Sequence, residues 1–469
     1  MRIPMTRRAR TPFWFALTLT LSDAIALIAI FTDTLPSVEM AAWIAVLAWA
    51  CTFANLVRRS THGVLSLPCG YLGLLGLFHL GLVVPACLGF EPSREARWLF
   101  SESTPKALLL CLIAFASFGL GALLAGRVSR EQFPQHFKVA DGGPGDDHSP
   151  GLLLGGIALG ILGVVCLTAG ASRMGMFEVL YYDFFALREL EDPRLFGVGY
   201  MFATMGMVIA GVGATARQLR FVSLGSVAVF APLFLYGFRG HLIVYFIAFL
   251  MVWDKKEPRV ARQVAVAAVL FILVLSPAVR LLRSGQSANL SEAAASVGAF
   301  DLVTEAGGSL RPLVETVDAL DYDNSGFWFG ASYLGAFARV IPNLSTQWAA
   351  PEARRTTDPA AWITSRVEPL TFRTGGGIGY SGVAEPYLNF GPVGVVAFFM
   401  LLGFILAAVD ERRPGIYARA VTACAYAALL WTVRNDFSNL VRPAVWAAAV
   451  VGVLYLLLAA RRLHFTAGR

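Results

Sequence analysis

Charged residues are scarce in this chain of 469 residues. Asp, Glu, Lys and Arg make up 15% of it, whereas hydrophobic residues make up 57%. Soluble domains carry roughly 25% charged residues, so the composition argues against a soluble protein. The alternating segments of about ten residues that are typical of a membrane β-barrel are not found. Helices satisfy their own backbone hydrogen bonds in lipid, and the sequence therefore predicts an all-α, polytopic transmembrane protein.

Cysteine is also scarce. The six cysteines lie inside apolar runs or at their ends, and no two are spaced like metal ligands. This pattern argues against a zinc site or a disulfide framework and favours packing roles. The formal net charge is +7, but the basic residues are dispersed over many short loops. The charge therefore does not indicate a nucleic-acid partner.

Long apolar runs recur along almost the whole chain. Each is close to the length of about 20 residues that crosses a bilayer as a helix. About twelve spans are predicted, at 12–31, 40–57, 64–90, 105–126, 151–169, 197–216, 221–237, 241–253, 264–282, 390–409, 416–433 and 443–460. The first run is not followed by a small-residue cleavage site, so we interpret it as an uncleaved span.

Lys and Arg set the predicted orientation. With the N-terminus in the cytoplasm, every predicted cytoplasmic segment carries at least two basic residues, as the positive-inside rule requires. Both termini are then cytoplasmic, and 139–150 is a flexible acidic cytoplasmic linker. The chain divides into 1–282 with nine spans, a large periplasmic loop at 283–389, and 390–469 with three spans and a cytoplasmic tail.

Arginines gather at span ends and in loops on the predicted outer side. They are Arg239, Arg280, Arg283, Arg339, Arg434 and Arg442. A charge at membrane depth is costly and usually faces a cavity or a partner, although long side chains also reach headgroups without further purpose. Acids in the same short turns are few, Asp436 being the clear candidate to pair with them. Because Arg binds phosphate bidentately, the set predicts one shared site for a pyrophosphate or another polyanion.

A glycine-rich stretch, GGGIGYSGVAEPYLNFGPVG at 375–394, precedes the tenth predicted span. Its glycines allow sharp bends or close approach to a ligand. Ser381 is a candidate helix N-cap, and Glu385 and Asn389 follow at spacings of four on the same helix face. Pro386 is tolerated only in a first turn, so the helix is expected to begin near Glu385. Glu385 is then either a general acid or base or a helix-capping carboxylate.

The long loop is predicted to contain helices. Amphipathic pieces at 291–303, 311–320 and 331–342 are expected to lie along the membrane surface as a lid. Trp328, Trp348 and Trp362 fit an interfacial aromatic belt better than a sugar-stacking surface.

Four segments resemble a known family, the O-antigen polymerases, which are Wzy-type polymerases of oligosaccharide repeat units. The segments are GFRGHLIVYFIAF (237–249), RVIPNLSTQWAAP (339–351), GGIGYSGVAEPYLNFGPVGV (376–395) and RNDFSNLVRPAVW (434–446). The resemblance covers mainly 237–446, and the first 200 residues share only hydropathy. The polar stretch 139–150 is longer than the family pattern leads one to expect.

The resemblance implies a membrane glycosyltransferase in the bacterial inner membrane. It would transfer the growing glycan from undecaprenyl pyrophosphate to the next lipid-linked repeat unit at the periplasmic face. The six arginines would stabilise the leaving pyrophosphate without a metal or other cofactor. Glu385 is the first candidate for the base and Asp436 the second. Glycan binding or loop support is expected of Tyr380, Ser381 and Asn389.

The expected partners are the lipid-linked oligosaccharide and membrane lipid, with a flippase and a chain-length regulator.

Two functions other than polymerase are compatible with a polytopic membrane protein, namely an O-antigen ligase and a transporter or flippase. An O-antigen ligase typically uses a catalytic His in its periplasmic loop, but the long loop has none and His241 is the only outward candidate. A transporter or flippase would show paired repeats and interrupted helices, and neither is recognised. The sugar, the linkage and the product, lipopolysaccharide O-antigen or exopolysaccharide, stay open.

Overall fold

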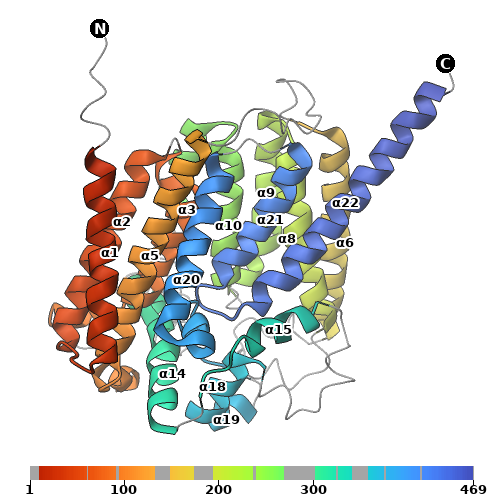
Figure 1. Ribbon diagram of the computed structural model, residues 1–469. Coiled ribbons are helices and arrows are strands. Elements are labelled where there is room, and N and C mark those ends of the chain that lie inside the picture. The colour runs from red at the N-terminus through yellow and green to blue at the C-terminus, as the bar shows by residue number, and fades with distance from the viewer. Residues whose placement is uncertain are drawn as a thin grey trace.

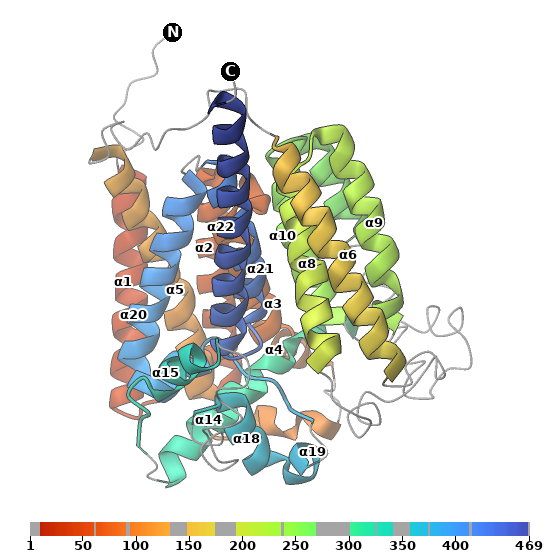
Figure 2. The same cartoon turned by 90° about the vertical axis from the view of Figure 1, so that its right-hand side faces the viewer.

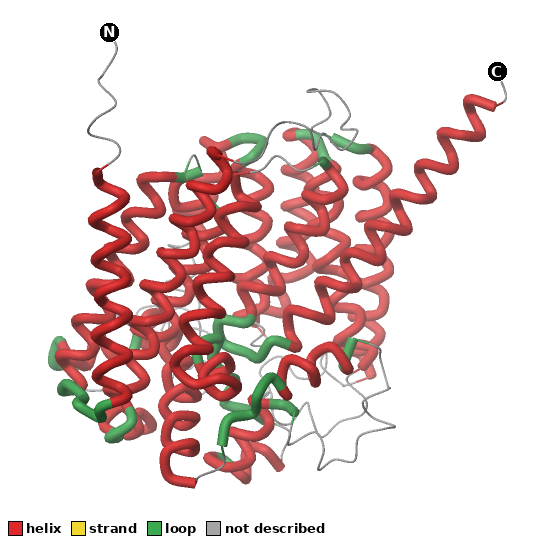
Figure 3. Tube along the Cα trace, viewed as in Figure 1, coloured by secondary structure: helices red, strands yellow, loops and turns green. Residues whose placement is uncertain are grey.

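The structure, a computed structural model, describes most of the chain. The described residues are 10–60, 62–90, 94–131, 148–173, 194–235, 239–268, 301–323, 326–340, 357–373, 376–411 and 415–467. Within these ranges the chain forms α-helices, short 3₁₀ turns and loops, without strands (Figure 3). The all-α prediction is therefore confirmed.

Seven helices of the described residues are long and apolar enough to cross a membrane. They are α1 (Arg10–Phe31), α2 (Val38–Arg59), α5 (Thr104–Glu131), α6 (Pro150–Arg173), α8 (Arg194–Gly213), α20 (Ala384–Glu411) and α22 (Ser438–Ala467). Shorter apolar helices accompany them, namely α3 (Leu67–Leu80), α10 (Arg239–Asp254) and α21 (Ile416–Trp431). The protein is a multi-pass membrane protein.

Helices fall in most of the other predicted ranges as well. The predicted third span is divided between α3 and α4 (Val83–Cys87), and the seventh, predicted at 221–237, overlaps α9 (Ala216–Leu235). The predicted ninth span, 264–282, lies mostly outside the described residues. The number of twelve crossings stays a prediction.

The two ends of the helix bundle differ in structure. The first turn of α1 and the last turn of α22 lie at one end, which we call the termini end (Figure 1). The opposite end, the loop end, carries the loop helices, which are α14 (Leu310–Asp323), α15 (Ala331–Ala338), α18 (Pro359–Val367) and α19 (Pro369–Arg373) (Figure 2). The amphipathic piece predicted at 311–320 lies within α14, and the piece at 331–342 is helical over Ala331–Ala338. Of the piece at 291–303, residues 301–303 belong to α13 (Asp301–Ala306), and 291–300 lies outside the described residues.

Glycines bring α5 and α20 into backbone contact at the centre of the bundle. A Cβ atom at Gly121 would overlap the carbonyl oxygen of Met400, and one at Gly403 would overlap that of Phe118. The span of α5 is 89% buried, which makes it the most enclosed of the long helices described. Small residues let the two helix backbones approach closely. This close packing matters in a membrane because lipid offers no hydrophobic drive for helix association.

Helix α20 is interrupted at Gly391, which corrects the expectation that no span is broken. Gly391 has φ 66° and ψ −161°, and Pro392 follows it. Positive φ favours glycine, and a Cβ at Gly391 would also lie 3.0 Å from the Phe327 ring. The carbonyls of Leu388 and Asn389 accept hydrogen bonds from the backbone N–H groups of residues 328 and 329, each at 3.0 Å. The first turns of α20 are therefore tied to the segment that leads into α15.

We predict that Gly121→Ala lowers the stability of the folded protein by about 1–3 kcal/mol, because the added methyl overpacks the contact between α5 and α20. Thermal unfolding of the purified protein in detergent measures this effect. Gly225→Ala in α9 is the matched control, since no atom lies within 4 Å of its Cβ position. Equal melting temperatures for the two variants would contradict the proposed packing.

Candidate active site

The start of α20 lies where sequence reasoning placed it. Ser381 Oγ accepts hydrogen bonds from the backbone N–H groups of Val383 at 3.1 Å and Ala384 at 3.2 Å. The helix begins at Ala384, so Pro386 stands in its first turn. Ser381 therefore caps the helix, as predicted from its type and position.

A buried histidine that sequence reasoning missed holds Ser381 in place. His79 in α3 is fully buried, and its Nδ1 lies 2.9 Å from the Leu75 carbonyl oxygen. A carbonyl only accepts, so Nδ1 carries the proton and Nε2 accepts from Ser381 Oγ at 2.7 Å. His79 lies inside the predicted third span, where a polar residue among apolar neighbours was the available signal.

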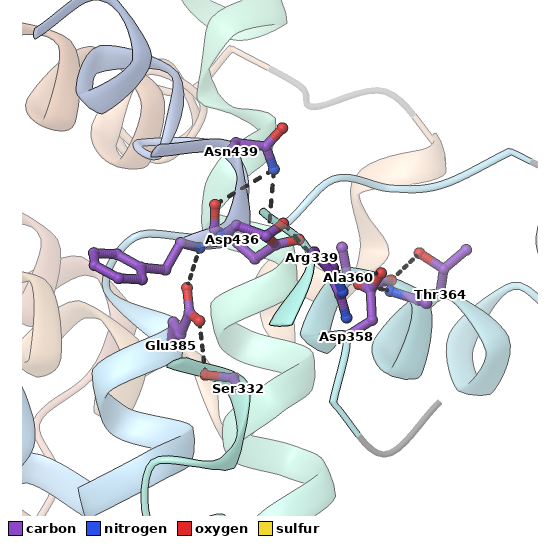
Figure 4. A network of polar contacts seen from close by, with 11 residues as sticks. Ser332, Arg339, Asp358, Ala360, Thr364, Glu385, Asp436 and Asn439 are labelled. Carbon is purple, nitrogen blue, oxygen red and sulfur yellow. Dashed lines mark hydrogen bonds and ion pairs between the residues drawn. The ribbon is translucent and has the colours of Figure 1, made fainter. Parts of the chain in front are cut away.

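Glu385 joins three separate parts of the chain. It is only 3% exposed. One carboxylate oxygen accepts a hydrogen bond from Ser332 Oγ at 2.7 Å, and the other accepts from the Phe437 backbone N–H at 2.6 Å (Figure 4). Ser332 belongs to α15, and Phe437 precedes α22. Glu385 thus connects α20 to a loop helix and to the turn between the last two spans.

Asn389 strengthens the same connection from the next turn of α20. Its Nδ2 donates to Ser332 Oγ and to the Glu385 carbonyl, both at 2.8 Å. Its Oδ1 accepts from the Gly330 backbone N–H at 2.9 Å. Glu385 and Asn389 therefore share one helix face, as their spacing predicts. Ser332, which bridges them, was not predicted, because local spacing gives no sign of a contact across more than fifty residues.

Tyr380 is buried beneath the loop helices. Its backbone N–H donates to the Arg434 carbonyl at 2.9 Å, and its hydroxyl lies 3.3 Å from Thr316 Oγ1 of α14. Burial raises the pKa of Tyr380 well above its usual value, so the phenol stays protonated. Of the two roles left open for this residue, the contacts favour loop support over glycan binding.

Asp436 and Arg339 belong to one polar network at the loop end (Figure 4). Asp436 is 5% exposed and accepts hydrogen bonds from the backbone N–H of Ser438, at 2.9 Å, and from its hydroxyl. Arg339 Nη1 forms an ion pair with Asp358 at 3.2 Å. Burial, and after it the charge of Asp358, raises the pKa of Asp436, while Ser438 and Arg339 oppose the shift. Arg339 is thus placed between two carboxylates.

A cavity of about 230 Å³ opens beside this network, between α8, α10, α15, α21 and α22. We call it the arginine cavity. Its polar wall carries Arg339, Arg442, Ser438 and Asn439. The remaining lining residues are Tyr200, Met201, Tyr245, Ala427, Ala428, Trp431 and Pro443. Arg339 Nη2 is buried and has no hydrogen-bond partner among the described residues, so it can still donate to an anionic or hydroxyl-bearing ligand.

Of the other four predicted arginines, the structure describes the side chain of Arg434 alone. The Arg434 guanidinium lies over the rings of Phe78 and Trp431, at 5.7 and 5.8 Å from their centroids. Because Trp431 lines the arginine cavity, Arg434 is in contact with its wall. The backbone of Arg239 begins α10, but its side chain is not described, and the same holds for His241. Arg280, Arg283 and Trp348 lie outside the described residues.

Trp328 and Trp362 contact each other edge to face, with ring centroids 5.4 Å apart.

Among the described residues, no three or more His, Cys, Asp and Glu side chains gather in a group that could hold a metal ion. The metal-independent reaction stays a prediction.

Comparison with known proteins now decides the family. The family model described as O-antigen polysaccharide polymerase Wzy matches residues 13–464, nearly the whole chain. The chain belongs to this Wzy family. Comparisons with curated proteins and with solved structures found no match.

Family membership extends the resemblance from 237–446 to the first 200 residues. It supports the function of a polymerase of lipid-linked oligosaccharide repeat units over the ligase and transporter alternatives. It also supports the status of this Wzy chain as an enzyme of the glycosyltransferase kind. The interruption of α20 at Gly391 therefore belongs to a polymerase rather than to a transporter.

We predict that Ser332→Ala destabilises this Wzy chain by about 1–3 kcal/mol, because the buried Oε1 of Glu385 loses its donor and Nδ2 of Asn389 loses one of its two acceptors. The melting temperature in detergent measures the loss. Ser365→Ala on α18 is the control, since that hydroxyl bonds only a carbonyl of its own helix. A Ser332→Ala protein as stable as this control would show that the network contributes nothing to the fold.

Proposed function

We propose that this Wzy chain transfers the growing glycan from undecaprenyl pyrophosphate to the next lipid-linked repeat unit, with the leaving pyrophosphate held in the arginine cavity. The observation that supports this proposal is the meeting of Arg339 and Arg442 in one cavity at the loop end. Two guanidinium groups supply the positive charge that a departing pyrophosphate requires. The proposed reaction therefore needs no metal ion.

The proposed site lies at the periplasmic face of the bacterial inner membrane. Basic residues support this orientation, because α2 ends with Arg58 and Arg59 and α10 is followed directly by Lys255 and Lys256, and both helices run toward the termini end (Figure 1). The positive-inside rule assigns that end to the cytoplasm, and both termini with it. The loop helices then belong to one large periplasmic loop at 283–389 within a protein of about twelve spans.

The chemistry is a displacement at the anomeric carbon of the growing glycan. A hydroxyl of the acceptor repeat unit attacks this carbon and forms the new glycosidic bond. The bond from the anomeric carbon to the pyrophosphate oxygen breaks, and its electron pair leaves with undecaprenyl pyrophosphate. The hydroxyl proton passes to a carboxylate. Apolar lining residues such as Met201, Ala427 and Ala428 suit the first part of the polyprenyl chain.

Asp436 is better placed than Glu385 to take that proton. It lies directly before α22, and its partner Ser438 and neighbour Asn439 both line the arginine cavity. Both oxygens of Glu385 are already occupied by Ser332 and the Phe437 N–H. We therefore assign the base to Asp436 and a positioning role to Glu385.

The loop helices cover the proposed site, and Asp358 at the N-terminus of α18 orients Arg339. A flippase that delivers repeat units and a chain-length regulator are the proposed protein partners. The cavity gives no information about the sugar or the linkage.

We predict that Arg339→Ala and Arg442→Ala each reduce polymer at least tenfold, because the departing pyrophosphate loses charge stabilisation worth at least about 1.4 kcal/mol. Complementation of a strain that lacks the gene measures polymer, and lipid-linked single repeats should accumulate. Arg373→Ala is the control, because Arg373 is exposed on α19 and does not line the cavity. Full-length polymer in both cavity variants, at normal levels of inserted protein, would remove the pyrophosphate assignment.

Substitution of each carboxylate by its isosteric amide distinguishes the roles of Asp436 and Glu385. Asp436→Asn still accepts the Ser438 N–H but cannot take a proton, so we predict a loss of polymer of at least a hundredfold. Glu385→Gln keeps an acceptor for Ser332 or Phe437 and should lose far less. Polymer assays at matched protein abundance compare the two. If Glu385→Gln is the more damaging change, the base is Glu385 and not Asp436.

A further inference from the structure

A second cavity lies toward the termini end, far along the same helices from the proposed catalytic site. It has a volume of about 50 Å³ and is enclosed by α3, α8, α10, α20 and α21. We call it the lysine cavity. Its basic wall carries Lys255 and Lys256, which follow α10, and Arg419 in the first turn of α21. Apolar walls formed by residues such as Met251 and Val252 adjoin this basic wall.

The carboxylates nearest this cavity already have structural partners. Asp254 is 2% exposed and lies 2.7 Å from His62 Nδ1. Asp410 Oδ1 accepts a hydrogen bond from the Leu67 N–H at 3.3 Å, at the start of α3. Neither forms a hydrogen bond or ion pair with Lys255, although both are near enough to act on its charge. The Lys255 ammonium group is therefore not paired with either carboxylate.

The two lysines differ in what they can offer a ligand. Lys256 Nζ donates to the carbonyls of Val212, at 2.9 Å, and Ala214, at the C-terminal end of α8. Its ammonium group is thus fixed by the fold. The Lys255 side chain is exposed, and its ammonium group makes no hydrogen bond or ion pair with any described residue. Its ammonium group is free to bind an anion that enters the cavity.

We propose that the lysine cavity binds the headgroup phosphate of an anionic phospholipid. A volume of about 50 Å³ accommodates roughly four water molecules, which is comparable with one phosphate group. Basic pockets between transmembrane helices are known receptors for such headgroups. The apolar walls beside the cations favour a lipid over free phosphate, because a lipid brings apolar surface next to its phosphate.

The site is distinct from the glycan-transfer site, and its role is structural. Helices α10 and α21 line both cavities, at opposite ends. A bound lipid phosphate would join the basic residues of these two helices at the termini end. The proposal does not depend on the proposed polymerase mechanism, since its test measures lipid binding and not polymer.

The test uses the full-length protein purified in an uncharged detergent. Its melting temperature is measured after addition of phosphatidylglycerol, phosphatidylcholine or inorganic phosphate. We expect phosphatidylglycerol alone to raise the melting temperature, with half-maximal effect at about fivefold higher lipid concentration in Lys255→Gln. Lys255→Arg should restore the wild-type response. The control is Arg259→Gln, because Arg259 is exposed near the same end but does not line the cavity.

Three outcomes would overturn the proposal. An equal rise with inorganic phosphate would assign the site to a free anion. An equal rise with phosphatidylcholine would show that the headgroup charge is not recognised. A response of Lys255→Gln that matches Arg259→Gln would place the lipid effect on the general surface. Native mass spectrometry, which counts retained phosphatidylglycerol in the wild type and in Lys255→Gln, provides an independent reading even if the variant unfolds at a lower temperature.

Discussion

The structure of the loop end depends on the hydrogen bonds that the buried carboxylate of Glu385 accepts. Glu385 accepts hydrogen bonds from α15 and from the turn before α22, so a single side chain fixes three segments that are distant in sequence. Removal of a carboxylate from water is costly unless its oxygens are hydrogen-bonded. Here the cost is offset by Ser332 and the Phe437 N–H. The position of Phe437 in turn sets the positions of Asp436 and Ser438, and through them one wall of the arginine cavity.

The interruption of α20 makes that network possible. A continuous helix would use the carbonyls of Leu388 and Asn389 in its own hydrogen bonds. Gly391 and Pro392 break the ladder, and the segment 328–329 takes these carbonyls instead. In a membrane protein, irregular backbone is tolerated where protein covers it. The segment that leads into α15 is therefore part of what stabilises the broken helix.

Local patterns in the sequence were enough for the helices and for the start of α20. Apolar runs of span length marked most helices, and Ser381 with Pro386 marked where α20 begins. The contacts of Ser332, His79 and Asp358 were not predictable, because they join residues far apart in the chain. The Gly391-Pro392 pair was a visible signal of the break in α20. The sequence did not show that the break frees the carbonyls of Leu388 and Asn389 to accept hydrogen bonds from residues 328 and 329. Of the six arginines predicted to share one site, Arg339 and Arg442 line a common cavity, which forms only once α15 packs beside α22; the shared anion site itself stays a prediction.

The surroundings of Arg339 and Lys255 suit the different roles proposed for the two ends of the bundle, which are glycan transfer at the loop end and lipid binding at the termini end. At the loop end, Arg339 lies close to Asp358 and Asp436, so its charge is partly balanced before any substrate arrives. A fully unbalanced guanidinium would hold pyrophosphate in reactant and product alike and would slow its release, whereas catalysis requires stronger binding in the transition state than in the ground state. At the termini end, Lys255 has no such acidic partner within hydrogen-bonding distance among the described residues. A resident lipid does not need to leave, so tight binding there carries no kinetic penalty.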